Sequence, residues 1–268
     1  MDASKATRIG LRIATGITLG FIYVPIGVIV LYGMNAGRVQ TWPLQGLTLD
    51  WFPRAFQDEG VRQALMASLG AGIGATILAL LLGSLLAFAV HRFRFFGRET
   101  LSFVVILPLA LPGIVTGIAL NTAFRTLGLD LGMLTVIVGH ATFCIVVVYN
   151  NAIARLRRSS RSIEEASMDL GATASQTFRY VTFPVLRSAL FAGALLAFAL
   201  SFDEIIVTTF TAGSGTQTLP IWIFSNYQRP NQLPLVNVAA VLVLVLSIVP
   251  VYLAQRLSSD STTVGGAR

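Results

Sequence analysis

The chain has 268 residues, of which 54% are hydrophobic and 12% charged, and its mean hydropathy is +0.75. Soluble domains carry about 25% charged residues, so this composition excludes an ordinary soluble protein and indicates a membrane protein. The net charge of +7 does not indicate a nucleic-acid partner, because the basic residues lie outside the apolar segments, where they report membrane topology.

Six apolar segments follow one another, each near the ~20 residues that a helix needs to cross the hydrocarbon core. They are residues 13–32, 67–90, 101–120, 133–153, 188–210 and 236–253. They lack the alternation of a transmembrane β-strand, so the predicted fold class is an all-α membrane protein with six transmembrane helices. The short connections predict one transmembrane domain over residues 1–268.

Most of the 19 Lys and Arg residues lie on the side that holds both termini and the 154–187 loop. Cytoplasmic loops retain an excess of basic residues, so we expect both termini and this loop in the cytoplasm. The first apolar segment is longer than the ~7–15 residues of a signal-peptide core, which favours a retained anchor helix. Cys144 is the single cysteine, so no disulfide framework is expected.

The segments between and within the spans carry local signals. Aromatic and charged residues over 33–66 are typical of a helix at the outer interface. Pro108 and Pro112 lie one turn apart in the third apolar segment and should kink that helix. Pro220 fits the first turn of a short external helix within 211–235.

The polar loop between the fourth and fifth segments has well-specified local chemistry. Ser162 and Glu165 have the spacing of a capping box that would start a short helix. Gly171 would stop that helix in a left-handed conformation, and Thr173 with Gln176 would open a second helix. The loop is therefore predicted to form a rigid helix–glycine–helix elbow, from which the chain returns at Pro184.

The first helix of this elbow presents small and acidic side chains. Small side chains at Ala166 and Ser167 allow close approach, and carboxylates at Glu164, Glu165 and Asp169 can pair with basic groups of a partner. The alternative is a solvated charged face on an ordinary cytoplasmic loop.

At this loop the sequence resembles the inner-membrane permease subunits of ABC importers. Their signature is Glu-Ala-Ala, three residues, Gly, nine residues, Ile, one residue and Leu-Pro. The matching positions here are Glu165-Ala166-Ser167, Gly171 and Val181-Thr182-Phe183-Pro184, with conservative departures at Ser167, Val181 and Phe183. The resemblance covers essentially the whole chain. It implies the MetI-like architecture of a type I importer permease, with a five-helix core over about 64–257.

The resemblance also implies what the chain works with. The 154–187 loop would insert its coupling helix into a separate ATPase subunit through Glu164, Glu165, Ala166, Ser167, Asp169, Gly171 and Pro184. The implied partners are a second homologous permease, an ATPase dimer, an extracytoplasmic solute-binding protein and lipid of the bacterial inner membrane. The only lysine is Lys5, so a phosphate-binding P-loop is absent, and we expect ATP and Mg²⁺ on the ATPase, no cofactor here and no enzymatic activity.

Within the importer permeases, the spermidine/putrescine group is the most similar. The similarity rests on residues 47–52, on Phe198-Ala199-Leu200-Ser201-Phe202-Asp203-Glu204, and on Thr218-Leu219-Pro220 with Pro234 and Asn237. Permeases for iron, amino acids or opine-like solutes share parts of this pattern, so the solute stays open.

Asp203 and Glu204 are the only formal charges within the six apolar segments, and such acids tend to mark a solute path. On a continuous helix Ser201, Glu204 and Thr208 would share one stripe, which favours Glu204 over Asp203 as the path-lining residue. His140 is expected at a similar depth and could pair with either acid. The candidate path residues are therefore Asp203, Glu204, Ser201, Phe202, His140 and Asn121, with Asn150 and Asn151 as further polar positions.

Two alternatives to this path remain. The acids could be hydrated or paired with Arg125, holding helices together instead of attracting a cationic solute. A secondary transporter could use the same two acids as a proton or ion relay, but the chain shows no inverted repeat, and the ordered loop favours the ATP-driven importer.

Overall fold

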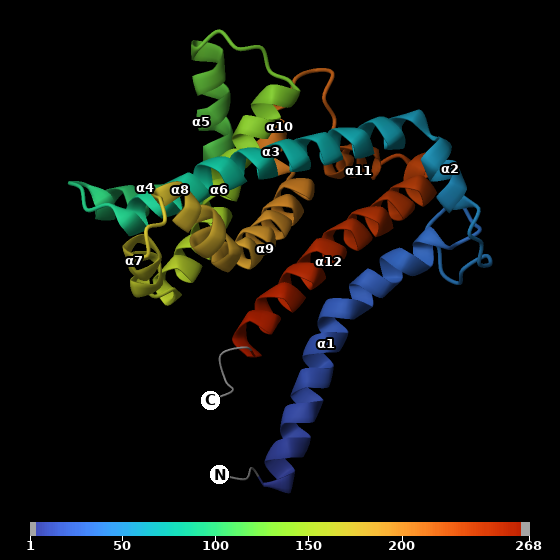
Figure 1. Ribbon diagram of the computed structural model, residues 1–268. Coiled ribbons are helices and arrows are strands. Elements are labelled where there is room, and N and C mark those ends of the chain that lie inside the picture. The colour runs from blue at the N-terminus through green and yellow to red at the C-terminus, as the bar shows by residue number, and fades with distance from the viewer. Residues whose placement is uncertain (1–3, 264–268) are drawn as a thin grey trace. The chain divides into compact units, whose positions relative to one another are not determined.

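The computed structural model describes residues 4–263, and regular structure there is helical apart from an isolated bridge between Asn35 and Leu47 (Figure 1). Within this described part, five helices are long and apolar enough to cross a membrane, or six if one bent pair counts as a single span. The prediction of an all-α membrane fold is confirmed. The described chain divides into two compact units, residues 4–62 with 223–242 and residues 63–222 with 243–263.

The first unit contains α1 (Lys5–Gly33) and α2 (Trp51–Gln57), together with the beginning of α12 (Leu233–Thr263). Asn35 is buried and organises the connection after α1, because its side-chain oxygen accepts the backbone N–H groups of Gly37 and Gln45. The indole of Trp51 donates to the Asn35 carbonyl at 2.8 Å, which anchors α2 against this connection. The helix expected between the first two spans is therefore α2.

The second unit holds most of the remaining helices. They are α3 (Glu59–Arg92), α4 (Arg98–Ala110), α5 (Gly113–Thr126), α6 (Met133–Arg158), α7 (Arg161–Asp169), α8 (Ala174–Thr177), α9 (Phe183–Phe202) and α10 (Ile206–Thr211). Helix α6 packs against α9, and small buried side chains such as Ala79, Val148 and Ala197 fill the core. Small residues let neighbouring helices approach closely without a hydrophobic driving force in lipid.

The third apolar segment is not one kinked helix but two helices, α4 and α5, that meet at an angle of 108°. The break falls at Leu111 and Pro112, where Leu111 is extended with ψ 143°. Proline disfavours the helical conformation in the residue before it and lacks an N–H, so Pro112 ends α4 and begins α5 instead of bending one helix. Helix α5 then packs against α10.

The fifth apolar segment also differs from the continuous helix predicted over 188–210. Helix α9 ends at Phe202, and α10 begins only at Ile206, so Asp203 and Glu204 lie at a break. Downstream, α11 (Leu219–Asn226) carries Pro220 in its first turn, which confirms the short helix expected there.

Candidate functional site

The predicted glycine stop in the polar loop is confirmed. Gly171 has φ +90°, a left-handed conformation that favours glycine. Its N–H donates to the Met168 carbonyl at 2.9 Å, and the Ala172 N–H donates to the Ser167 carbonyl at 3.1 Å. These two bonds form a Schellman motif that satisfies the last carbonyls of α7. The elbow is therefore ordered by its own backbone.

The second predicted capping box is also present. The Gln176 N–H donates to the Thr173 hydroxyl at 3.3 Å, and the Thr173 N–H donates to the Gln176 side-chain oxygen at 2.8 Å. Helix α8 then continues through a π-helical turn, Phe178–Thr182, into α9, whose first turn carries Pro184. Pro184 is therefore not a separate return but lies within one continuous helix, because the second short helix runs on into the fifth span.

The first predicted capping box is wrong. Helix α7 begins at Arg161 after Ser160, so Ser162 lies inside the first turn and cannot cap it. Glu165 pairs instead with Arg161 at 3.2 Å, one helical turn away. The Ser162 hydroxyl contacts the Ser160 hydroxyl at 2.6 Å.

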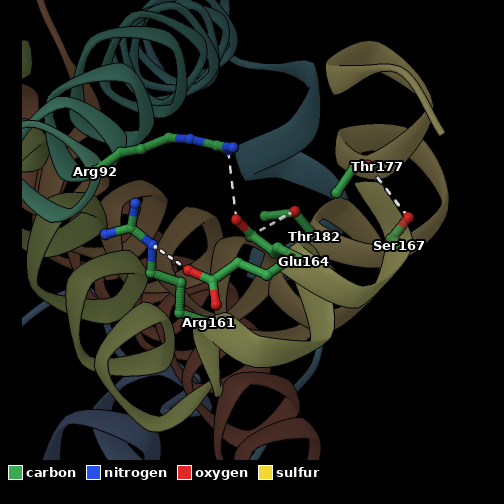
Figure 2. A network of polar contacts seen from close by, with 7 residues as sticks. Arg92, Arg161, Glu164, Ser167, Thr177 and Thr182 are labelled. Carbon is green, nitrogen blue, oxygen red and sulfur yellow. Dashed lines mark hydrogen bonds and ion pairs between the residues drawn. The ribbon is translucent and has the colours of Figure 1, made fainter. Parts of the chain in front are cut away.

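The acidic and small residues of α7 divide between two faces. Glu165, Ala166 and Asp169 are exposed, as a docking surface requires. Glu164 and Ser167 point into the protein, where Glu164 contacts Arg92 and Thr182 and Ser167 contacts Thr177 (Figure 2). Glu164 and Ser167 are therefore not presented to a partner in the way predicted for this helix, because other elements of the same chain take up their polar atoms, and their role in ATPase coupling stays a prediction.

The exposed face of α7 and its end also carries apolar side chains that the sequence reasoning missed. Ile163 is 54% exposed and Leu170 is 90% exposed. Leu170 lies in the turn before Gly171, with Met168 nearby, so a partner surface would meet both apolar and acidic groups. The sequence signal was three large apolar residues, Ile163, Met168 and Leu170, in a segment that is otherwise mostly polar.

The two acids at the α9–α10 break have different surroundings. Asp203 is exposed at the C-terminal end of α9. Glu204 is half-buried, and its side-chain oxygen accepts the N–H of Val207 at 2.9 Å. Glu204 therefore satisfies a free N–H at the start of α10, and Asp203 is the acid of the pair that is exposed. The continuous helix on which the stripe depended is broken between Phe202 and Ile206, so the stripe no longer favours Glu204 over Asp203, and which acid lines the path stays a prediction.

His140 does not pair with either acid. Its ring is fully buried, with Nδ1 at 2.7 Å from the Ser201 hydroxyl and Nε2 at 2.8 Å from the Thr208 hydroxyl. Ser201 and Phe202 are buried as well. His140 therefore joins α6, α9 and α10 inside the packed core.

Asn121 is half-buried and bridges two elements. Its side-chain amide donates to the Phe210 carbonyl, and its side-chain oxygen accepts Nε of Arg125 at 3.0 Å. Arg125 therefore bonds to Asn121, and the structure does not show the pairing of Arg125 with the two acids that was held open.

A cavity of about 310 Å³ lies between α6 and α9. Its lining consists of Asn150, Asn151, Ala154, Arg155, Arg158, Ser188, Ala189 and Ala192. Asn150 and Asn151 were expected as polar positions, whereas the two arginines were read only as topology signals. Their convergence with Ser188 depends on the packing of α6 against α9, which the sequence does not encode locally.

Comparisons with known proteins agree with this arrangement. Residues 79–262, more than half of the chain, match the family described as the inner membrane component of binding-protein-dependent transport systems. The putrescine transport system permease protein PotI of Escherichia coli K12 is 36% identical over 232 residues, which cover 84% of this chain and 82% of PotI.

The spermidine/putrescine transport system permease protein PotC of the same strain is 32% identical over 243 residues, covering 90% of this chain and 91% of PotC. A chain of a bacterial ABC transporter that imports the acidic polysaccharide alginate superposes with a TM-score of 0.69 at 18% identity, over 97% of this chain and 99% of the other. At that identity the likeness shows a shared fold.

Proposed function

The chain belongs to the family of inner membrane components of binding-protein-dependent transport systems, and from this premise we propose that it carries a polyamine, putrescine or spermidine, across the inner membrane. The observation that carries the choice of solute is the identity with putrescine and spermidine/putrescine permeases over most of both chains. A second permease subunit completes the path, and an extracytoplasmic protein delivers the solute.

The energy comes from a separate ATPase dimer that binds ATP and Mg²⁺. Its contact on this chain is the exposed face of α7, where Glu165 and Asp169 stand beside apolar Ile163 and Leu170. The Schellman motif at Gly171 keeps that face in a fixed orientation to the chain that follows it. ATP binding and hydrolysis move α7, and the helices alternate between outward and inward access.

Asp203 attracts the cationic solute. It is exposed at the break between α9 and α10, on the side that the basic-residue distribution assigns to the exterior. A carboxylate in a partly apolar setting raises the local concentration of cations. Glu204 supports this position through its bond to the Val207 N–H, which fixes the start of α10.

The test is uptake of radiolabelled putrescine by cells that contain the complete importer. Asp203→Asn should lower the uptake rate about tenfold, because it removes the exposed charge. Glu204→Gln should lower it less, because a side-chain amide oxygen can still accept the Val207 N–H. The matched control is Asp130→Asn, an exposed acid in the loop before α6, which should leave uptake unchanged.

Two results would overturn the proposal. Uptake by Asp203→Asn at the wild-type rate, with a normal amount of protein in the membrane, would remove the role of this carboxylate. Loss of wild-type uptake on collapse of the proton gradient, with ATP maintained, would instead indicate an ion-coupled secondary transporter.

A further inference from the structure

Glu164 lies on the inward face of α7 and contacts two other elements at once (Figure 2). One carboxylate oxygen, Oε2, is 3.4 Å from Nη1 of Arg92, the last residue of α3. The other, Oε1, accepts the hydroxyl of Thr182 at 2.7 Å, directly before α9 begins. The carboxylate thus joins the loop helix to the last residue of α3 and to the π-helical turn that leads into α9.

Burial shows that these contacts are specific. The side chain of Glu164 is 21% exposed and that of Arg92 is 35% exposed, whereas the neighbouring Glu165 side chain is 57% exposed. Thr182 is only 4% exposed, so its hydroxyl has little access to water once the carboxylate is removed. Leaving a buried hydroxyl without its partner is unfavourable, so the Glu164 carboxylate stabilises this contact.

Other contacts surround the carboxylate and connect the same elements. The ring of Phe178, in the π-helical turn, packs edge-on against Phe88 of α3 with centroids 5.5 Å apart. Ser167 of α7 contacts the buried Thr177 at 3.2 Å. A π-helical turn is rare and often occurs at functional positions. Helix α7, the end of α3 and the continuous helix from α8 to α9 therefore meet through one ion pair, two hydroxyl contacts and one aromatic contact.

We propose that Glu164 is a positioning residue that transmits displacement of α7 to both α3 and α9, through Arg92 and Thr182. The inference rests on the proposed docking of α7 to an ATPase. Glu164 and Glu165 then have separate roles. Glu165 stays at the surface for the partner, and Glu164 holds the docked helix to the spans that must move.

Geometry supports this division of roles. Coupling between distant sites needs an element that both sites bias, connected by packed or hydrogen-bonded groups. Helix α7 has nine residues and little apolar burial of its own, so side-chain contacts decide how firmly it follows α3 and α9. Without the Arg92–Glu164 contact, α7 would still dock to the ATPase, but its displacement would no longer move α3.

The first measurement is hydrogen exchange of the purified full-length chain in detergent, which requires no partner and no solute. Arg92→Ala should raise the exchange rate of the α7 amides about fivefold, because the helix loses its tie to α3. Thr182→Val should raise it as well. The matched control is Arg94→Ala, an exposed arginine two residues away, which should leave α7 exchange unchanged.

The second measurement is the amount of putrescine transported per ATP hydrolysed by the complete reconstituted importer. Arg92→Ala should lower this ratio at least about threefold while ATP hydrolysis continues. Arg92→Lys, which keeps the charge, should restore most of the ratio. The exchanged pair Arg92→Glu with Glu164→Arg should recover more of it than either single substitution.

The outcomes separate this inference from the proposed function. Faster α7 exchange together with a lower ratio and rescue by Arg92→Lys would support the role of Glu164. Unchanged α7 exchange in Arg92→Ala, or faster exchange with an unchanged ratio, would overturn it even if the wild type transports putrescine. Absence of ATP-driven putrescine uptake in the wild type would overturn the proposed function, and with it the coupling role, while the exchange data still decide whether the Arg92–Glu164 contact holds α7.

Discussion

At the scale of single residues, neighbouring polar side chains have different tasks. Asp203 and Glu204 are adjacent, yet one is exposed and the other caps α10. Glu164 and Glu165 are adjacent, yet one faces inward and the other outward. The residue type predicts that each carboxylate has a functional or structural role. It does not predict whether the side chain faces solvent or the protein interior, because that depends on where the helix begins or breaks.

His140 provides a test of this distinction between core and path. His140→Ala should lower the free energy of unfolding by about 3 kcal/mol, because it removes a buried ring, takes its imidazole partner from the Ser201 hydroxyl and leaves the Thr208 hydroxyl with the Glu204 carbonyl alone. The measurement is thermal unfolding of the purified chain in detergent.

The matched control for His140 is the other histidine, His91, which is half-buried at the end of α3. His91→Ala should change the free energy of unfolding by less than about 1 kcal/mol. Equal destabilisation by both substitutions would contradict the structural role of His140.

At the scale of elements, the spacing between helices depends on a few glycines. A Cβ on Gly83 would lie 2.9 Å from the Ile145 carbonyl oxygen and 3.0 Å from Cβ of Val148, so α3 and α6 can approach this closely only without a side chain there. A Cβ on Gly70 of the same helix would have only Cε of Met133 nearby, at 3.9 Å.

These two glycines give a matched pair of substitutions. Gly83→Ala should destabilise the chain by about 1–3 kcal/mol, because backbone atoms of α6 would have to move. Gly70→Ala should change the free energy of unfolding by less than about 0.5 kcal/mol. Both gain the same helix propensity, so the difference in melting temperature isolates the packing, and equal melting temperatures would contradict the close α3–α6 approach.

At the scale of the whole molecule, membrane topology depends on the bent pair α4–α5. If the pair crosses the membrane as one span, the loop after α5 is external and the loop that holds α7 is cytoplasmic. If it returns to the side from which it entered, both loops exchange sides. The excess of Arg around α7 favours the crossing.

Cysteine labelling distinguishes the two topologies. Leu127→Cys, at a position 72% exposed after α5, should react with a membrane-impermeant maleimide in intact spheroplasts. Leu170→Cys, at a position 90% exposed after α7, should react only after permeabilisation. The natural Cys144 is buried and provides the unreactive background. Labelling in the opposite order would show that α4–α5 does not cross.

The sequence by itself determined the helical membrane class, the glycine stop at Gly171, the Thr173–Gln176 capping box and the short helix that carries Pro220. These depend on apolar length and on interactions between residues close in the chain. It predicted a disturbance at Pro112 but not its 108° extent.

Only the tertiary structure decided what faces what. The break at Asp203 appears only in the folded chain. The contacts of His140 with Ser201 and Thr208, and those of Glu164 with Arg92 and Thr182, join residues far apart in the chain. Local propensity contains no information on such partners, because helix packing brings them together and burial then makes each polar group require one.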